Sequence, residues 1–261
     1  MKQRLLASAA VLAAFAGVAV TTSVRSSGQQ PAVQSQRSIV NVVRIKPDMA
    51  DAWIDFQTKR TIPALKKAGV QQRDAYQSVY GAGFEYRLVT PLAKFADRDN
   101  PMSPIEQALG AAGAKEYNDA YRKLIAGTQS FVLQGMADAS FDPNPNAVYK
   151  VMVLSLVHVT PGRGDDYASY VKNDLLPVQK KGQVKRYLVN QVVFGGDPNE
   201  YRTATFMEKF ADLDAGPAAV RVLGQEGAAK LALKTAGIVT SIQRSVYLRN
   251  EALSFRVKPT T

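Results

Sequence analysis

An internal duplication is the feature that most constrains how this 261-residue chain can fold. Residues 85–97 recur as residues 200–212, with eight identities in thirteen positions at an offset of 115. Elsewhere the offset is 114, and the corresponding residues are Pro47 and Pro161, Pro63 and Pro177, Ser140 and Ser254, and Phe141 and Phe255. A register held along most of the chain indicates two copies of one structural unit.

Each copy shows the same order of predicted elements. A short β-rich run that ends just before a proline predicts a first strand, and an apolar stripe at helical spacing predicts the helix after it. Pro63 and Pro177 fall within those helices and should kink them or begin a new first turn. Two further strands joined by a short glycine-containing link predict a β-hairpin, and a second helix and a last strand follow. The predicted strands are 39–45, 73–80, 85–92 and a strand including 131–133, then 151–159, 185–194, 200–206 and a strand including 246–248.

The order β-α-β-β-α-β is the ferredoxin-like arrangement. It places both helices on one face of an antiparallel sheet and leaves the other face uncovered. We therefore predict an α+β protein of two tandem ferredoxin-like repeats, residues 38–141 and 149–256, with a turn-rich linker at 142–148. The two copies can cover their open faces by packing together as a pseudo-dimeric α/β barrel.

The first residues are typical of a secretory signal peptide. Lys2 and Arg4 precede an uncharged apolar run, and small polar residues follow it, so residues 1–27 are predicted to direct export to the periplasm or the medium. An uncleaved N-terminal anchor is the alternative, although the run is short for a membrane span. Residues 28–37 are rich in Ser and Gln and are predicted to be a disordered leader.

Composition excludes several kinds of chemistry. The chain has no cysteine and one histidine, His158, so thiol chemistry, disulfides and multi-histidine metal sites are excluded. We predict no metal and no cofactor, and we assign no catalytic residue. The net charge of +11 is not concentrated in a basic run with interleaved aromatic residues, so we expect no nucleic-acid partner. A monomeric pseudo-dimer and a homo-oligomer both remain open.

With its duplicated βαββαβ order and its duplicated proline-to-proline first helix, the chain resembles the dimeric α/β-barrel superfamily, which includes antibiotic-biosynthesis monooxygenase, Dabb and NIPSNAP-type domains. The resemblance covers about residues 38–255 and implies a barrel built from two copies in one chain. Members carry out cofactor-independent oxygenation, haem degradation or chlorite chemistry. The haem-dependent branches use a histidine on a helix, whereas His158 is predicted at the end of a strand.

Two first-strand residues are candidates for a ligand site. If the strands alternate, Arg44 shares a face with Val40 and Val42, and His158 shares a face with Leu154 and Leu156. The opposite faces are the more apolar and should pack on the helices. Arg44 and His158 then either point into the barrel, where they could bind an anion or a carbonyl group, or lie at a solvated strand end.

Four further residues occupy matching strand positions in the two copies. Gln77 and Gln191 could hydrogen-bond a ligand from opposite walls, or they could make cross-strand or surface contacts. Tyr86 and Tyr201 suit either a ligand in the lumen or core packing.

Three functions fit these features. The first is an exported protein that binds a small, partly apolar, neutral or anionic molecule in the barrel, and the second is a cofactor-independent monooxygenase acting on a phenolic substrate. The third is an interaction module with a filled barrel. The sequence leaves open whether the protein is an enzyme. A cavity of about 300 Å³ or more with convergent polar groups would favour the first two functions, and a packed lumen would favour the third.

Overall fold

The computed structural model describes residues 37–257, which belong to one compact unit, Pro31–Thr261. The predicted signal peptide and nearly all of the predicted leader lie outside the described residues. Among residues 37–257, no helix combines the length and apolar character needed to cross a membrane.

The first repeat has the predicted βαββαβ order. Its strands are β1 (Arg37–Ile45), β2 (Gln72–Tyr80), β3 (Glu85–Leu92) and β4 (Ile125–Gly135). Its helices are α1 (Ala50–Phe56), α2 (Ile62–Lys67) and α3 (Pro104–Leu124), with short helical turns at η1 (Pro47–Met49), η2 (Gln57–Thr61), η3 (Phe95–Arg98) and η4 (Ala137–Ala139).

The second repeat follows the same order. Its strands are β5 (Val151–Val159), β6 (Arg186–Phe194), β7 (Glu200–Met207) and β8 (Val239–Arg249), and β9 (Phe255–Arg256) follows them. Its helices are α4 (Gly164–Tyr170), α5 (Leu176–Lys181) and α6 (Ala218–Leu233), with turns at η5 (Val171–Leu175) and η6 (Phe210–Leu213).

The two prolines act alike in the two repeats. Pro63 and Pro177 lie in the first turns of α2 and α5, and a five-residue π-helical turn comes directly before each of them. Because proline has no N–H and its ring collides with the preceding turn, a regular α-helix cannot continue through it. The wider π-helical turn keeps the chain helical until a new α-helix begins one residue before the proline, which is one of the two outcomes predicted from the sequence.

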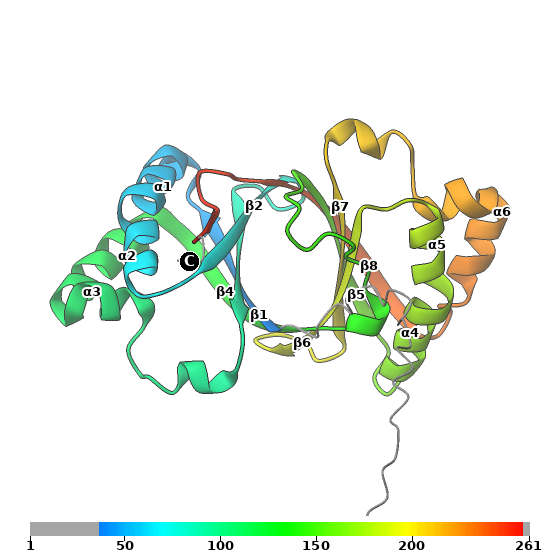
Figure 1. Ribbon diagram of the computed structural model, residues 1–261, viewed down its shortest axis with the longest axis horizontal. Helices are drawn as coiled ribbons and strands as arrows, with labels where there is room; N and C mark the ends of the chain where they lie inside the picture. Colours follow the sequence, from blue (N-terminus) through cyan, green and yellow to red (C-terminus); the bar gives the residue numbers. More distant parts are fainter. Residues whose placement is uncertain (1–36, 258–261) are drawn as a thin grey trace, which may run out of the picture. The chain divides into compact units, whose positions relative to one another are not determined.

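Within residues 37–257, eight strands close into a barrel in the order β3-β1-β4-β6-β7-β5-β8-β2, and β2 pairs again with β3. The two sheets join edge to edge, through the antiparallel pairs β4–β6 and β2–β8. The helices α1–α3 and α4–α6 lie outside the barrel on opposite sides (Figure 1). The copies therefore share one hydrogen-bonded sheet as well as a common interior.

The segment after the last strand of each repeat crosses to the other repeat. After β4, the Met136 N–H donates to the Val189 carbonyl, and Phe141 forms a β-bridge with Tyr187. After β8, the strand β9 pairs with the start of β2, and Leu253 is fully buried against the first repeat. The matching Ser-Phe pairs of the sequence are these two crossing segments, so each repeat helps to complete the core of the other.

Four apolar clusters divide between the two faces of the sheet. Two of them lie between the sheet and the helices, and they are centred on Trp53 of α1 and on Tyr167 of α4. The other two contain the opposite faces of the same strands, including Val40 and Val42 of β1 and Leu154 of β5, and therefore line the lumen. The strand alternation predicted from the sequence separates these faces in β1 and β5.

We expect Gly195→Ala to destabilise the protein by about 3 kcal/mol, through overpacking and an unfavourable backbone conformation. Gly195 has φ +86°, and a Cβ atom there would lie 2.0 Å from the Ser130 carbonyl oxygen, where the β6–β7 hairpin meets β4. Gly216→Ala is the control, because Gly216 has φ +72° but no atom near its Cβ position, so only the backbone cost of about 1 kcal/mol applies. Urea unfolding of both variants measures the difference, and equal losses would contradict the close approach at the seam.

Candidate functional site

Arg44 and His158 lie at the same mouth of the barrel. From β1 through β4, β6 and β7 to β5, each neighbouring pair is antiparallel, so β1 and β5 run in the same direction. Arg44 and His158 are next to the last residues of these strands. We call this end of the barrel the Arg44–His158 mouth, and the end where β4 is followed by the linker to β5 the linker mouth.

A hydrogen-bonded network from both repeats lies below Arg44. The Arg87 Nε atom donates to the Tyr247 hydroxyl over 2.8 Å, and this hydroxyl donates to Glu85 Oε1 over 2.8 Å. Arg87 Nη2 lies 3.3 Å from the same carboxylate, and Arg44 Nε lies 3.6 Å from Glu85 Oε2. Burial raises the pKa of the Tyr247 phenol, so it remains a neutral link between the two charges.

The equivalent network in the second repeat has fewer members. Arg202 Nε donates directly to Glu200 Oε1 over 2.6 Å, and the Phe131 ring stacks on the guanidinium at 3.7 Å. The Arg202 side chain is 3% exposed, and its Nη1 atom has no hydrogen-bond partner among the described residues. Burial lowers the pKa of Arg202, opposed by Glu200, and the positive charge of Arg87 adds to the lowering. The charge of Arg87 therefore acts on Arg202 across the lumen.

His158 faces two carboxylates at the rim of the mouth. Its Nε2 atom is 3.7 Å from Glu200 Oε2, and its Nδ1 atom is 3.8 Å from Asp197 Oδ2. The side chain is 34% exposed. The backbone N–H of Asn199 is the main cause that holds the pKa of Asp197 below its usual value. His158 therefore belongs to a polar rim beside the buried Arg202–Glu200 pair.

Part of the lumen wall is accessible. Val89, Leu156 and Leu188 pack against the lumen clusters and face inward, yet each remains partly exposed. Asn190 pairs in register with Arg202 and shares its inward face, and it too is partly exposed. Because strand pairing closes the barrel on all sides, accessible surface at these positions indicates unfilled space inside the lumen.

The structure separates the six residues predicted for the site. It brings Arg44 and His158 to one mouth on the lumen face. Gln77 and Gln191 pair in register with Tyr86 and Tyr201, which lie in the helix-facing cores, so the glutamines share that outer face. Because successive side chains of a strand point to opposite faces, these four residues do not reach the lumen.

Sequence reasoning missed the charged residues of the lumen. Glu85 and Arg87, and Glu200 and Arg202, flank the tyrosines in the repeated Glu-Tyr-Arg sequence. Alternation places each tyrosine on one face and its two charged neighbours on the other. The duplicated motif itself was the signal that could have found them, but the choice of the inward face needed the register of β3 and β7. Tyr247 carries no repeat signal, because Leu133 stands at the equivalent position of β4.

The linker occupies the other mouth. Arg186 pairs with Asp142 at 2.9 Å, donates to the carbonyl oxygen of Asn144, and lies over the ring of Tyr149 at 4.7 Å. Tyr149 is buried in a lumen cluster with Met152. These contacts pack the linker against the linker mouth of the barrel.

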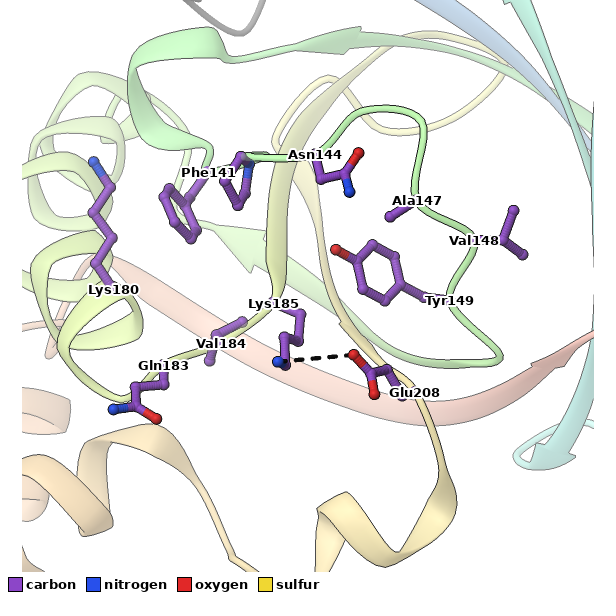
Figure 2. Close-up of a pocket in the computed structure, with 11 residues that line it drawn as sticks. Phe141, Asn144, Ala147, Val148, Tyr149, Lys180, Gln183, Val184, Lys185 and Glu208 are labelled. Atoms are coloured by element: carbon purple, nitrogen blue, oxygen red, sulfur yellow. Dashed lines mark ion pairs between the residues drawn. The ribbon is translucent and has the colours of Figure 1, made fainter. Parts of the chain in front are cut away.

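A pocket of about 480 Å³ lies beside the linker (Figure 2). Phe141 and Lys180 lie at one end, and Lys185 and Glu208 form an ion pair at 3.7 Å at the other. Lys180 Nζ is 5.3 Å from the centre of the Phe141 ring, and Lys66 and Phe255 repeat this contact at the same distance in the other half. Because the contact occurs in both halves, it helps to pack each crossing segment against a helix of the other repeat, α2 or α5.

The position of the one histidine differs from that of a helix-borne haem ligand. His158 lies near the end of β5, is 34% exposed, and has its two ring nitrogens 3.7 and 3.8 Å from carboxylate oxygens. No group of three or more His, Asp or Glu residues between residues 37 and 257 is arranged to hold a metal ion.

Solved structures share this fold. A protein from Lactobacillus acidophilus NCFM named as a "putative monooxygenase" superposes with a TM-score of 0.54 at 11% identity, over 85% of this chain and 97% of that one. An anthrone oxidase-like protein gives 0.58 at 11% identity, over 86% and 94%. A "putative chlorite dismutase" gives 0.51 at 10% identity, over 84% and 97%. The fold is that of the dimeric α/β barrels, formed here by one chain.

No protein-family model matches the sequence, and no curated protein matches it.

Proposed function

We propose that the barrel binds a small, partly apolar molecule that enters through the Arg44–His158 mouth. The observation that carries this proposal is the partial exposure of Val89, Leu156, Leu188 and Asn190, which face the interior of a closed barrel. The apolar surface of the three aliphatic side chains suits a hydrocarbon or aromatic body, and Asn190 and Arg202 offer hydrogen-bond donors to an oxygen-bearing group.

The probe 8-anilinonaphthalene-1-sulfonate tests the proposal, because it combines an aromatic body with one negative charge. We expect saturable binding to the folded wild-type protein, followed by fluorescence. Leu156→Trp should raise the dissociation constant at least about tenfold, since the indole would occupy the lumen and remove most of the apolar contact. Fluorescence titration and the near-ultraviolet circular dichroism of each protein are measured together, so that binding to an unfolded variant is recognised.

Leu248→Trp is the matched control. Leu248 lies on β8, pairs with the outward-facing Gln77, and is 37% exposed. The same substitution there should leave probe affinity unchanged. Equal affinities in wild type and Leu156→Trp, or no binding by a well-folded wild type, would rule out a ligand site in the lumen and favour an interaction module.

Oxygenation of a phenolic substrate without a cofactor is the second candidate. It is supported by the names of two structures with the same fold, a monooxygenase and an anthrone oxidase-like protein. Here the lumen would hold the electron-rich ring while oxygen reacts with it. An oxygen electrode with anthrone or a quinol as substrate tests this candidate. Uptake that Leu156→Trp abolishes would support it, whereas probe binding without oxygen uptake leaves a binding protein.

Export is proposed from residues 1–27 alone. An intact mass of the protein recovered from the cell envelope or the medium that lacks this segment would support it. A full-length mass in the membrane fraction would indicate the uncleaved anchor instead.

A further inference from the structure

The lumen network has two halves related by the duplication, and one pair of equivalent positions holds different residues in the two halves. Arg87 and Arg202 come from the same place in the duplicated Glu-Tyr-Arg sequence. Tyr247 pairs with Met152 of β5 in the register in which Leu133 pairs with Ser38 of β1. At the two seams, Tyr247 lies opposite Ser78 and Leu133 lies opposite Val192, again at an offset of 114. Leu133 therefore occupies the same position relative to Arg202 that Tyr247 occupies relative to Arg87.

The hydroxyl of Tyr247 completes the first half. It accepts from Arg87 Nε and donates to Glu85, so one neutral oxygen lies between the two charges. Within the described residues, Arg87 has no buried nitrogen without a partner.

Leu133 cannot supply such an oxygen to the second half. There Arg202 Nε donates directly to Glu200, and Nη1 is buried without a hydrogen-bond partner in the described part of the chain. A buried donor without an acceptor is costly, and the penalty is larger when the donor is charged. Leu156 and Asn190 pair with Arg202 on its two sides, and both border the accessible lumen.

We propose that Arg202 is the specificity residue of the lumen and that its Nη1 atom binds the single oxyanion of the ligand. This inference rests on the proposed function. The ligand is then an organic monoanion, a carboxylate or a phenolate on an apolar body, bound once per barrel. Its oxygen accepts from Arg202 Nη1, because Nε of Arg202 already donates to Glu200, whereas in the first half the Tyr247 hydroxyl accepts from Arg87 Nε. The body of the ligand lies along Leu156 and Val89, which is the partly exposed apolar wall.

Leu133→Tyr tests this assignment by building the missing hydroxyl into the protein. The new phenol should compete with the ligand for Arg202 and raise the dissociation constant of 8-anilinonaphthalene-1-sulfonate about tenfold relative to Leu133→Phe, the value of a hydrogen bond to a charged group. Leu133→Phe adds the same bulk without the oxygen and isolates that effect. N-phenyl-1-naphthylamine, which lacks the sulfonate, should bind the two variants equally.

A second pair of variants avoids the added bulk if Leu133→Tyr does not fold. The Leu133→Gln side chain is close to leucine in size and its carbonyl can accept from Nη1, and Leu133→Met is the apolar control. The glutamine variant should again weaken binding of the anionic probe alone.

The outcomes separate this inference from the proposed function. If the folded wild type binds neither probe, the proposed function fails and this inference fails with it. If the wild type binds both probes but Leu133→Tyr and Leu133→Phe bind the anionic probe equally, the lumen site stands and the role of Arg202 is overturned. Loss of both probes in Leu133→Tyr, but not in Leu133→Phe, also overturns it, because a specific effect on the anion is required.

Discussion

Raising the pH from 10 toward 12 is expected to unfold the protein. Burial raises the pKa of Tyr76 to about 12 and raises the pKa of Tyr167 and Tyr187 further, from an ordinary value of 10.0. In this range the unfolded chain loses phenolic protons that the folded chain keeps. The unfolded state then binds fewer protons, so the free energy of unfolding falls as pH rises, by about 1.4 kcal/mol per pH unit for each tyrosine and about 4 kcal/mol for the three.

Circular dichroism and tyrosinate absorbance, recorded together against pH, measure this transition. Tyr167→Phe is the matched variant, because it keeps the ring in the core beneath α4 and removes one ionisable hydroxyl. Its stability should fall less steeply above pH 10, by about 1.4 kcal/mol per pH unit. Tyrosines that ionise near pH 10 while the fold remains intact would contradict the burial of these hydroxyl groups.

Trp53→Ala is expected to destabilise the protein by about 4 kcal/mol, the usual loss for a buried aromatic side chain truncated to alanine. Trp53 is fully buried at the centre of the first helix-facing core, with its ring centre 6.0 Å from that of Tyr86 and 5.5 Å from that of Tyr121. Leu253 from the crossing segment of the second repeat packs in the same core. The substitution therefore weakens contacts within the first repeat and between the repeats.

Urea unfolding followed by circular dichroism should show one transition at lower denaturant in Trp53→Ala. Both repeats should unfold together, because the β4–β6 and β2–β8 pairs and the crossing segments join them. Trp53→Phe is the control: it keeps an aromatic ring and removes the indole N–H, which is buried without a partner in the described residues, so the loss should stay below about 2 kcal/mol. Two transitions with only one displaced would show that the repeats fold independently.

Much of the local structure is predictable from the sequence. The predicted strand 151–159 coincides with β5, and 85–92 coincides with β3. The prolines and the hairpin glycines affect the backbone conformation of residues close to them in the sequence, so local propensity determines their effect. Alternation along β1 also predicts that Arg44 shares a face with Val40 and Val42, because the side-chain period of a strand is fixed by its backbone.

The candidate site is less predictable. The Glu-Tyr-Arg motif was visible as a repeat, but its tyrosines and not its charged residues were selected for the ligand site. Single-residue reasoning assigns buried positions to aromatic residues and exposed ones to charges. Glu85 and Arg87 can be buried because their side chains form an ion pair. The Tyr247 hydroxyl that joins them comes from a strand about 160 residues later in the chain.

The sequence by itself determined the duplication, the βαββαβ order of each copy and the alternation of the strands, since these follow from repeated identities and from local backbone geometry. Only the tertiary structure decided that the sheets join edge to edge and that the crossing segments exchange between repeats. It also decided that the Tyr247 hydroxyl joins Arg87 to Glu85, while Arg202 Nη1 has no hydrogen-bond partner among the described residues. These features depend on contacts between residues far apart in the chain, where one hydroxyl group in an otherwise repeated framework makes the two halves chemically different.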